Sequence, residues 1–320
     1  MKRFSIVASH MPSEYHGADE VALTKMAEAS SYNSDHIVAT AYFLVNGGLY
    51  LATSDRMRIL DPNGGWCHTN TADRVVRCLK HCAEKCKCID WCTRTILDHS
   101  ANSILPWLPS KGSIDTMPID VHAGEHSYQP KYANDVAKII AMVSNSGFVC
   151  QMSAPFSGTS HDQMILENAR FKSRWLDTDK FLCDGVFAQS AQILTPASRS
   201  QLYPKKKKAG HNVHEMLKSN EMHAHFRARA EHCFSASLFN RFRCFSRWQR
   251  SNELLTYAVV FAQNLLNWEL LLRHGPKGRY EPASEYSEAL VAELQEKFTK
   301  HANMSNRYPE DKKDKQRRRE

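Results

Sequence analysis

The chain has 320 residues, of which 42% are apolar and 24% are charged, and its formal net charge is +8. These values are typical of a globular protein with one large domain or two ordinary ones, and the sequence has no internal repeat. Ten cysteines would suit a secreted disulfide scaffold, but the chain is long and residues 1–10 contain no uninterrupted apolar run. We therefore expect a reduced compartment, the cytosol or the nucleus.

The first third of the sequence predicts helices. We expect a poorly ordered N-terminus over residues 1–33, followed by a helical region over 34–110. Apolar residues recur at helical spacing over 35–58 and are interrupted at Gly47-Gly48, which predicts two short helices. Residues 61–65 form a loop, after which Thr69 or Thr71 caps a helix that reaches about residue 97, with an inner stripe of apolar residues and cysteines. The proline and glycine residues of 106–112 mark a domain boundary.

After this boundary the pattern changes to strands followed by helices. We predict strands over 114–121, 136–143, 148–152, 180–184 and 192–195, a turn over 145–147, and helices over 162–174, 213–245 and 252–274. Polar residues interrupt the apolar stretch 257–272, so it should be a buried helix and not a membrane span. This order predicts an α/β layer fold over 111–275, with a basic insertion at 200–215 and a polar tail over 276–320 that carries a basic run.

Four acidic residues lie at positions that suit metal chemistry. Asp115 lies within an apolar strand, Asp162 begins a helix, Asp184 ends a strand, and Glu231 shares the apolar face of a helix. A carboxylate on a buried face is costly unless something compensates its charge, and a divalent cation compensates several at once. The alternatives are a turn residue at Asp184, a first-turn acid at Asp162, and an ion pair between Glu231 and Arg227, four residues earlier.

The segments around these acids, taken in order, resemble the motif blocks of PIF/Harbinger-type DDE transposases, the family of the Harbinger transposase-derived nucleases. The likeness covers about residues 112–268. The blocks read Gly158-Thr159-Ser160-His161-Asp162, Phe181-Leu182-Cys183-Asp184-Gly185-Val186-Phe187, Ile193-Leu194-Thr195-Pro196, Arg229-Ala230-Glu231-His232-Cys233-Phe234 and Asn240-Arg241-Phe242-Arg243-Cys244-Phe245. The family has a further block, ahead of these, around its first acid. In this chain Thr116 follows Asp115 where the family has glycine, which makes Asp120 a fallback for the first carboxylate. The separation of the last two acids, 231 − 184 = 47, is stretched by the lysine-rich loop.

The resemblance implies a ribonuclease-H-like mixed sheet flanked by helices and a metal-dependent DNA endonuclease. Asp115, Asp184 and Glu231 would be the catalytic acids, holding two Mg²⁺ or Mn²⁺ ions for cleavage of phosphodiester bonds, with Asp162 as an extra ligand. The alternative is a domesticated derivative, catalytically weak or inactive, that serves as a DNA-binding or adaptor protein. Relatives often act with a separate Myb-like DNA-binding protein, and they carry a helix-turn-helix where residues 34–110 lie.

The basic excess gathers in residues 205–208, 227–250 and 312–319, which indicates a polyanionic partner or an ordinary solvated surface. On the functional interpretation, basic side chains near Glu231 and in the lysine loop contact DNA phosphates, and the C-terminal run directs nuclear import. These candidate DNA contacts are Lys205, Lys206, Arg227, Arg241 and Arg243. The first three cysteines of residues 78–92 lie four residues apart. This spacing favours a buried stripe on a helix over a zinc site.

Overall fold

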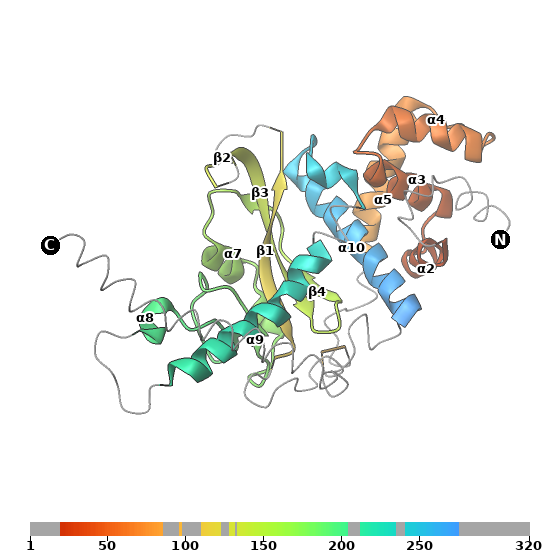
Figure 1. Cartoon of the computed structure of the whole chain (residues 1–320). Helices are drawn as coiled ribbons and strands as arrows, with labels where there is room; N and C mark the ends of the chain where they lie inside the picture. The colour runs from red at the N-terminus through yellow and green to blue at the C-terminus, as the bar shows by residue number, and fades with distance from the viewer. Residues whose placement is uncertain are drawn as a thin grey trace.

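The computed structural model describes residues 20–85, 96–97, 110–122, 128–131, 133–203, 212–234 and 241–274. Within these ranges the chain is a mixed sheet covered by helices, with a group of helices at its N-terminal side (Figure 1). The predicted α/β class is therefore confirmed. The lysine loop, the C-terminal basic run and most of the proposed domain boundary lie outside the described residues.

Four helices make up the N-terminal group: α2 (Glu20–Ser30), α3 (Ser34–Val45), α4 (Tyr50–Leu60) and α5 (His68–Lys85). The two short helices predicted over 35–58 are confirmed, and Gly47 and Gly48 between them have positive φ, which glycine adopts without strain. The prediction of a poorly ordered segment up to residue 33 was wrong over α2. Ala22, Leu23 and Met26 form a narrow buried face on this helix. The residues around them are of mixed polarity, so the sequence pattern did not reveal that face.

The start of α5 differs from the prediction. The helix begins at His68, ahead of Thr69 and Thr71, and the Asn70 side chain accepts a hydrogen bond from the Cys67 amide at 3.0 Å. Thr71 is fully buried and its hydroxyl therefore faces the protein interior. The loop before α5 is tied to it by Arg74, which donates to the Gly64 carbonyl and stacks over the Trp66 ring at 4.4 Å. Whether α5 reads DNA stays a prediction.

The sheet has the order β2-β3-β1-β6-β7, and β4 and β5 also pair with β3. Its central pair, β1 and β3, is antiparallel, whereas β6 and β7 run parallel to β1. The strands are β1 (Gly112–Asp120), β2 (Tyr128–Gln129), β3 (Asn134–Ser144), β4 (Val149–Met152), β5 (Phe156–Ser157), β6 (Phe181–Leu182) and β7 (Ile193–Leu194). All five predicted strands and the turn over 145–147 are thus found, and Gly147 in that turn has a φ of +95°.

The remaining helices cover the two faces of this sheet. They are α7 (Asp162–Asn168), η3 (Phe171–Arg174), α8 (Arg199–Leu202), α9 (Val213–His232), η5 (Arg243–Ser246) and α10 (Asn252–His274). The prediction of one helix over 213–245 was wrong, because α9 has its last α-helical residue at His232 and a separate 3-10 turn follows at η5. Within the described parts of the chain, every helix is too short or too polar to span a lipid bilayer.

Alternation along β1 and β3 separates two layers of the core. Met117 and Ile139 face the cluster that contains α9 and α10, whereas Ile114 and Ile140 face the cluster that contains α7 and η3. Because residues paired across antiparallel strands lie on the same face, the register Asp115↔Ala141 assigns Asp115 to the α9 side.

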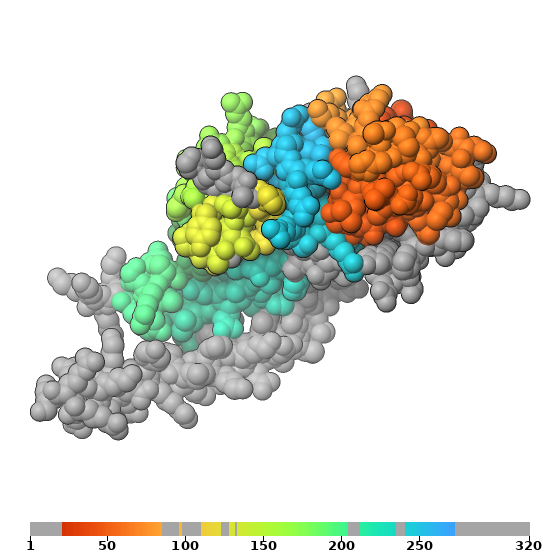
Figure 2. Space-filling view, turned by 90° about the horizontal axis from the view of Figure 1, so that it is seen from above, coloured from red at the N-terminus to blue at the C-terminus, as the bar shows by residue number. Residues whose placement is uncertain are grey.

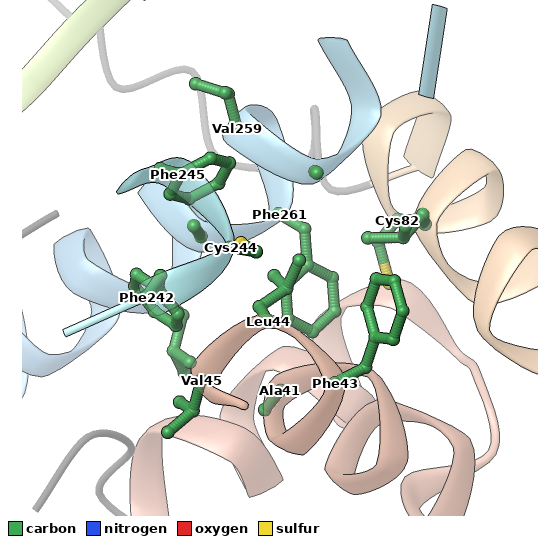
Figure 3. Close-up of a cluster of buried hydrophobic side chains, with 14 of the residues drawn as sticks. Ala41, Phe43, Leu44, Val45, Cys82, Phe242, Cys244, Phe245, Val259 and Phe261 are labelled. Carbon is green, nitrogen blue, oxygen red and sulfur yellow. The ribbon is translucent and has the colours of Figure 1, made fainter. Parts of the chain in front are cut away.

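The N-terminal helices share this core with the rest of the chain, so a boundary near residue 110 does not separate two hydrophobic cores. Helix α10 packs against α5 and α2, and η5 packs against α3. Phe43 and Leu44 of α3 lie beside Cys244 of η5 and Phe261 of α10 (Figure 3). In the space-filling view, η5 and α10 (blue) lie between the N-terminal helices (orange) and the strands (yellow; Figure 2).

Helix α10 is also bound directly to the sheet. The side chain of Asn267, which is 1% exposed, accepts from the Val149 amide at 3.1 Å and donates to the Val149 carbonyl at 2.9 Å. Gln263, one turn earlier, donates to the same Asn267 oxygen at 2.9 Å. These bonds satisfy backbone groups of β4 that would otherwise lie buried without a partner.

Candidate active site

Asp115 and Asp184 are brought together by two neighbouring parallel strands. β6 is parallel to β1, and Leu182 is paired with Ser113. Asp184 and Asp115 each come two residues later in their segments, so Asp184 lies level with Asp115. Asp184 follows the end of β6 and is exposed, and its carboxylate accepts from the Gly185 amide at 2.6 Å. Asp115 is more enclosed, with a side chain that is 17% exposed.

Glu231 is carried to the same place by α9, which crosses β1 (Figure 1). Two hydrogen bonds fix the helix on the sheet. The Ser113 hydroxyl donates to the Phe226 carbonyl at 3.3 Å, and the His223 ring donates through Nε2 to the Leu194 carbonyl at 2.9 Å. Burial lowers the pKa of His223, which favours the neutral form of its ring.

Arg227 links the first and third acids. Its Nη1 lies 2.9 Å from Asp115 Oδ2 and its Nη2 lies 2.8 Å from Glu231 Oε1. The Arg227 side chain is 22% exposed and that of Glu231 is 49% exposed, so the group lies at the edge of the core and is open to solvent on the Glu231 side. The ion pair between Arg227 and Glu231, one of the interpretations of the sequence, is therefore present.

The electrostatics of Asp115 reflect this crowding. The pKa of Asp115 is raised from 3.8 to about 6, and burial is the main cause; Arg227 opposes the rise, whereas the negative charges of Glu231 and Asp184 add to it. Each of the two acids thus lies close enough to affect the titration of Asp115. Carboxylates from β1, the end of β6 and α9 therefore lie in one region of the domain, within electrostatic range of Asp115.

Asp162 does not join them. It is the first residue of α7, where its Oδ1 accepts from Lys138 Nζ at 3.0 Å, and Lys138 also donates to the Ser160 carbonyl at 2.9 Å. Lys138 is opposite Pro118 in the β1–β3 register, which places it on the sheet face away from Asp115. The structure therefore gives Asp162 a lysine partner across the sheet from the other three acids. The fallback acid Asp120 also lies on that second face, and accepts from Asn134.

Carboxylate oxygens are the ligands that Mg²⁺ and Mn²⁺ prefer, and three carboxylates in one region carry negative charge that a divalent ion would neutralise. The donor set of Asp115, Asp184 and Glu231 therefore fits such an ion. In the structure these three acids are not arranged as the ligands of one metal ion. Across the described ranges, no three His, Cys, Asp or Glu side chains are placed to hold one metal ion. The guanidinium of Arg227 supplies the positive charge between Asp115 and Glu231.

Two other arginines of the basic stretch 227–250 have partners within the protein. Arg241 forms a bidentate ion pair with the buried Glu269 of α10. Arg229 is buried, donates to the Asn145 carbonyl at 2.8 Å and stacks on Phe226. Arg241 is therefore held within the protein by its ion pair, whereas Arg243 lies on the surface. Lys205 and Lys206 lie outside the described residues.

His223 was missed by the sequence analysis. It precedes Arg227 by four residues, and Arg227 precedes Glu231 by four, so the three share one stripe of α9. The charge of Asp184 acts on His223 in the direction that raises its pKa, so His223 lies within electrostatic range of the second acid. The i, i+4, i+8 spacing of polar side chains was the signal that could have found it.

The cysteine stripe of α5 lies away from these acids. Cys78 and Cys82 are buried, with their sulfur atoms 4.0 Å apart, as expected for small side chains on one helical stripe. The later cysteines of this segment, Cys86, Cys88 and Cys92, lie outside the described residues.

A mixed sheet with one acid on its central strand, one after the neighbouring parallel strand and one on a covering helix defines a nuclease-type α/β domain. Residues 113–267 match the family model described as DDE superfamily endonuclease, and this segment contains all three acids. This match suggests a nuclease- or transposase-like function for the segment, with DNA as the substrate. Comparisons with curated proteins and with solved structures gave no match.

Proposed function

We propose that this protein is a divalent-metal-dependent DNA endonuclease of the PIF/Harbinger type, with Asp115, Asp184 and Glu231 as its catalytic acids. The observation that carries this proposal is the convergence of the three carboxylates from β1, the end of β6 and α9. The family match over 113–267 and the order of the motif blocks support it. We propose a nuclear location and, as in relatives, a Myb-like DNA-binding partner.

The three acids would hold Mg²⁺ or Mn²⁺. Bound divalent ions supply two effects in such nucleases, activation of water or a 3′-hydroxyl and stabilisation of the departing oxygen. The protein contributes the positions of the ligands. The β1–β6 register fixes Asp115 beside Asp184, and the bonds of Ser113 and His223 fix α9, which carries Glu231. The exposed Arg243 and the lysines Lys205 and Lys206 are proposed contacts to DNA phosphates.

The second candidate function is a domesticated derivative that binds DNA without cutting it. The ion pairs of Arg227 with Asp115 and Glu231 favour it, because they satisfy two of the three acids without a metal ion. The two candidates differ in one measurable property, Mg²⁺- or Mn²⁺-dependent strand cleavage.

The test is the nicking of supercoiled plasmid DNA in the presence of Mg²⁺ or Mn²⁺. Asp184→Asn and Glu231→Gln keep the shape of each side chain and remove one charge, so the nuclease proposal expects both to lower the nicking rate at least about a hundredfold. Asp55→Asn, which changes an exposed aspartate on α4, is the matched control and should nick at the wild-type rate. Equal nicking by all four proteins would assign the activity to a contaminant. DNA binding without any nicking would select the second candidate.

A further inference from the structure

Arg227 is the cation around which the proposed catalytic acids are arranged. Its two terminal nitrogens are used on different carboxylates, Nη1 on Asp115 at 2.9 Å and Nη2 on Glu231 at 2.8 Å. One acid comes from β1 and the other from α9, so a single guanidinium joins the strand to the helix. This guanidinium is therefore a positive charge that the two carboxylates share.

The oxygens that Arg227 binds are the ones a metal ion would need. Asp115 Oδ2 and Glu231 Oε1 each accept from the guanidinium, and no described set of three ligands is arranged for a metal ion at present. A lysine could leave such a place by losing its proton, but a guanidinium keeps its charge in proteins. The arginine can therefore yield these oxygens only by moving its side chain, and its 22% exposure leaves it a path toward solvent.

We propose that Arg227 is a positioning residue that holds Asp115 and Glu231 together in the metal-free protein and competes with divalent metal for their oxygens. This inference rests on the proposed metal-dependent function, and it adds that the chain carries its own competitor for the metal. Binding of a divalent ion then requires the two ion pairs to open. The competitor makes the apparent metal affinity lower than that of the same three acids without it.

The test is a calorimetric titration of Mn²⁺ into metal-free full-length protein at constant ionic strength. Arg227→Gln removes the competing charge and should bind Mn²⁺ about fivefold more tightly than wild type, which corresponds to about 1 kcal/mol at 1.4 kcal/mol per factor of ten. Arg229→Gln removes a second guanidinium from the same helix, one that is bonded to Asn145 and stacked on Phe226. This control should bind Mn²⁺ with the wild-type affinity.

A second measurement does not depend on calorimetry. The metal-free Arg227→Gln protein should melt at a lower temperature than wild type, because Asp115 and Glu231 lose their shared counter-charge. Saturating Mn²⁺ should then raise its melting temperature by more than it raises that of wild type. If Arg227→Gln does not fold, Arg227→Lys serves instead. An ammonium cannot bridge two acids as the guanidinium fork does, so this variant should also bind Mn²⁺ more tightly than wild type.

The outcomes separate this inference from the proposed function. Asp184→Asn should weaken Mn²⁺ binding. If it does, while Arg227→Gln binds Mn²⁺ no more tightly than wild type, the competition is overturned and the metal site remains. If Asp184→Asn and wild type bind Mn²⁺ equally, or neither binds it, the proposed metal site fails and the inference fails with it.

Discussion

Replacing Asp115 by asparagine should stabilise the metal-free protein at neutral pH, although it removes a proposed catalytic acid. The carboxyl group of Asp115 is largely enclosed, with 17% of its side chain exposed, and burial is the main reason why its pKa rises from 3.8 to about 6. The carboxylate form is therefore more costly in the folded protein than in the unfolded chain. An amide resembles the neutral acid in shape and avoids this cost.

The magnitude follows from the difference between the two pKa values. At 1.36 kcal/mol per pKa unit, a rise from 3.8 to about 6 corresponds to about 3 kcal/mol of unfolding free energy. Because the folded pKa is the higher one, the wild-type protein has this contribution in full below pH 3.8 and loses it as the pH rises through about 6. The advantage of Asp115→Asn should therefore be small near pH 4 and reach its full value above pH 7.

The assay is urea unfolding in EDTA, with both proteins compared at several pH values between 4 and 8. The matched control is Asp162→Asn, which breaks the 3.0 Å pair with Lys138 and should lower the unfolding free energy at pH 7. A lower stability of Asp115→Asn at pH 7.5 would refute the reasoning, since it would mean that the ion pair with Arg227 outweighs the cost of burial. Added Mn²⁺ should reverse the order, because only the wild-type protein keeps all three acids.

Three further predictions concern the rest of the described structure. Glu269→Gln leaves the charge of Arg241 without its buried partner and should cost about 3–5 kcal/mol in urea unfolding, whereas the double replacement Arg241→Met with Glu269→Leu should recover most of that loss. Asn267→Leu removes both bonds to the Val149 backbone and should cost about 2–3 kcal/mol in thermal unfolding, with faster amide exchange at Val149. A hydrogen bond from a neighbouring threonine lowers the pKa of the exposed Cys67, so peptide mapping after brief treatment with iodoacetamide should find it alkylated before the buried cysteines.

The strands, and the positions of Asp115 within one strand and Asp184 after another, could be predicted because their signals are local. An aspartate inside an apolar strand and another directly after a strand are visible in short windows of sequence, and parallel neighbours then bring such positions together. The short helices on either side of Gly47-Gly48 and the full extent of α10 were found for the same reason. Asp162 was grouped with the acids because a helix start gives no indication of which sheet face the helix covers.

The fates of the arginines could not be predicted, because their partners are distant in the sequence. Arg229 binds the carbonyl of Asn145, 84 positions away, and Arg241 binds Glu269, 28 positions away. Arg227 reaches Asp115 across 112 positions. Local composition shows only a basic stretch in all three cases. Which guanidinium enters the core, and which one meets an acid of the site, depends on how α9 and α10 pack on the sheet.

The shared core around α10 has a consequence for how such a chain can evolve. Leu255 and Phe261 of this helix belong to the same core as the N-terminal helices, while the side chain of Asn267 is hydrogen-bonded to the backbone of β4. A recombination event that replaced the first 110 residues with a foreign module would leave this apolar surface bare and prone to aggregation. The N-terminal helices and the segment that matches the endonuclease family must therefore be inherited together, and either part can change only by substitutions that preserve the shared core.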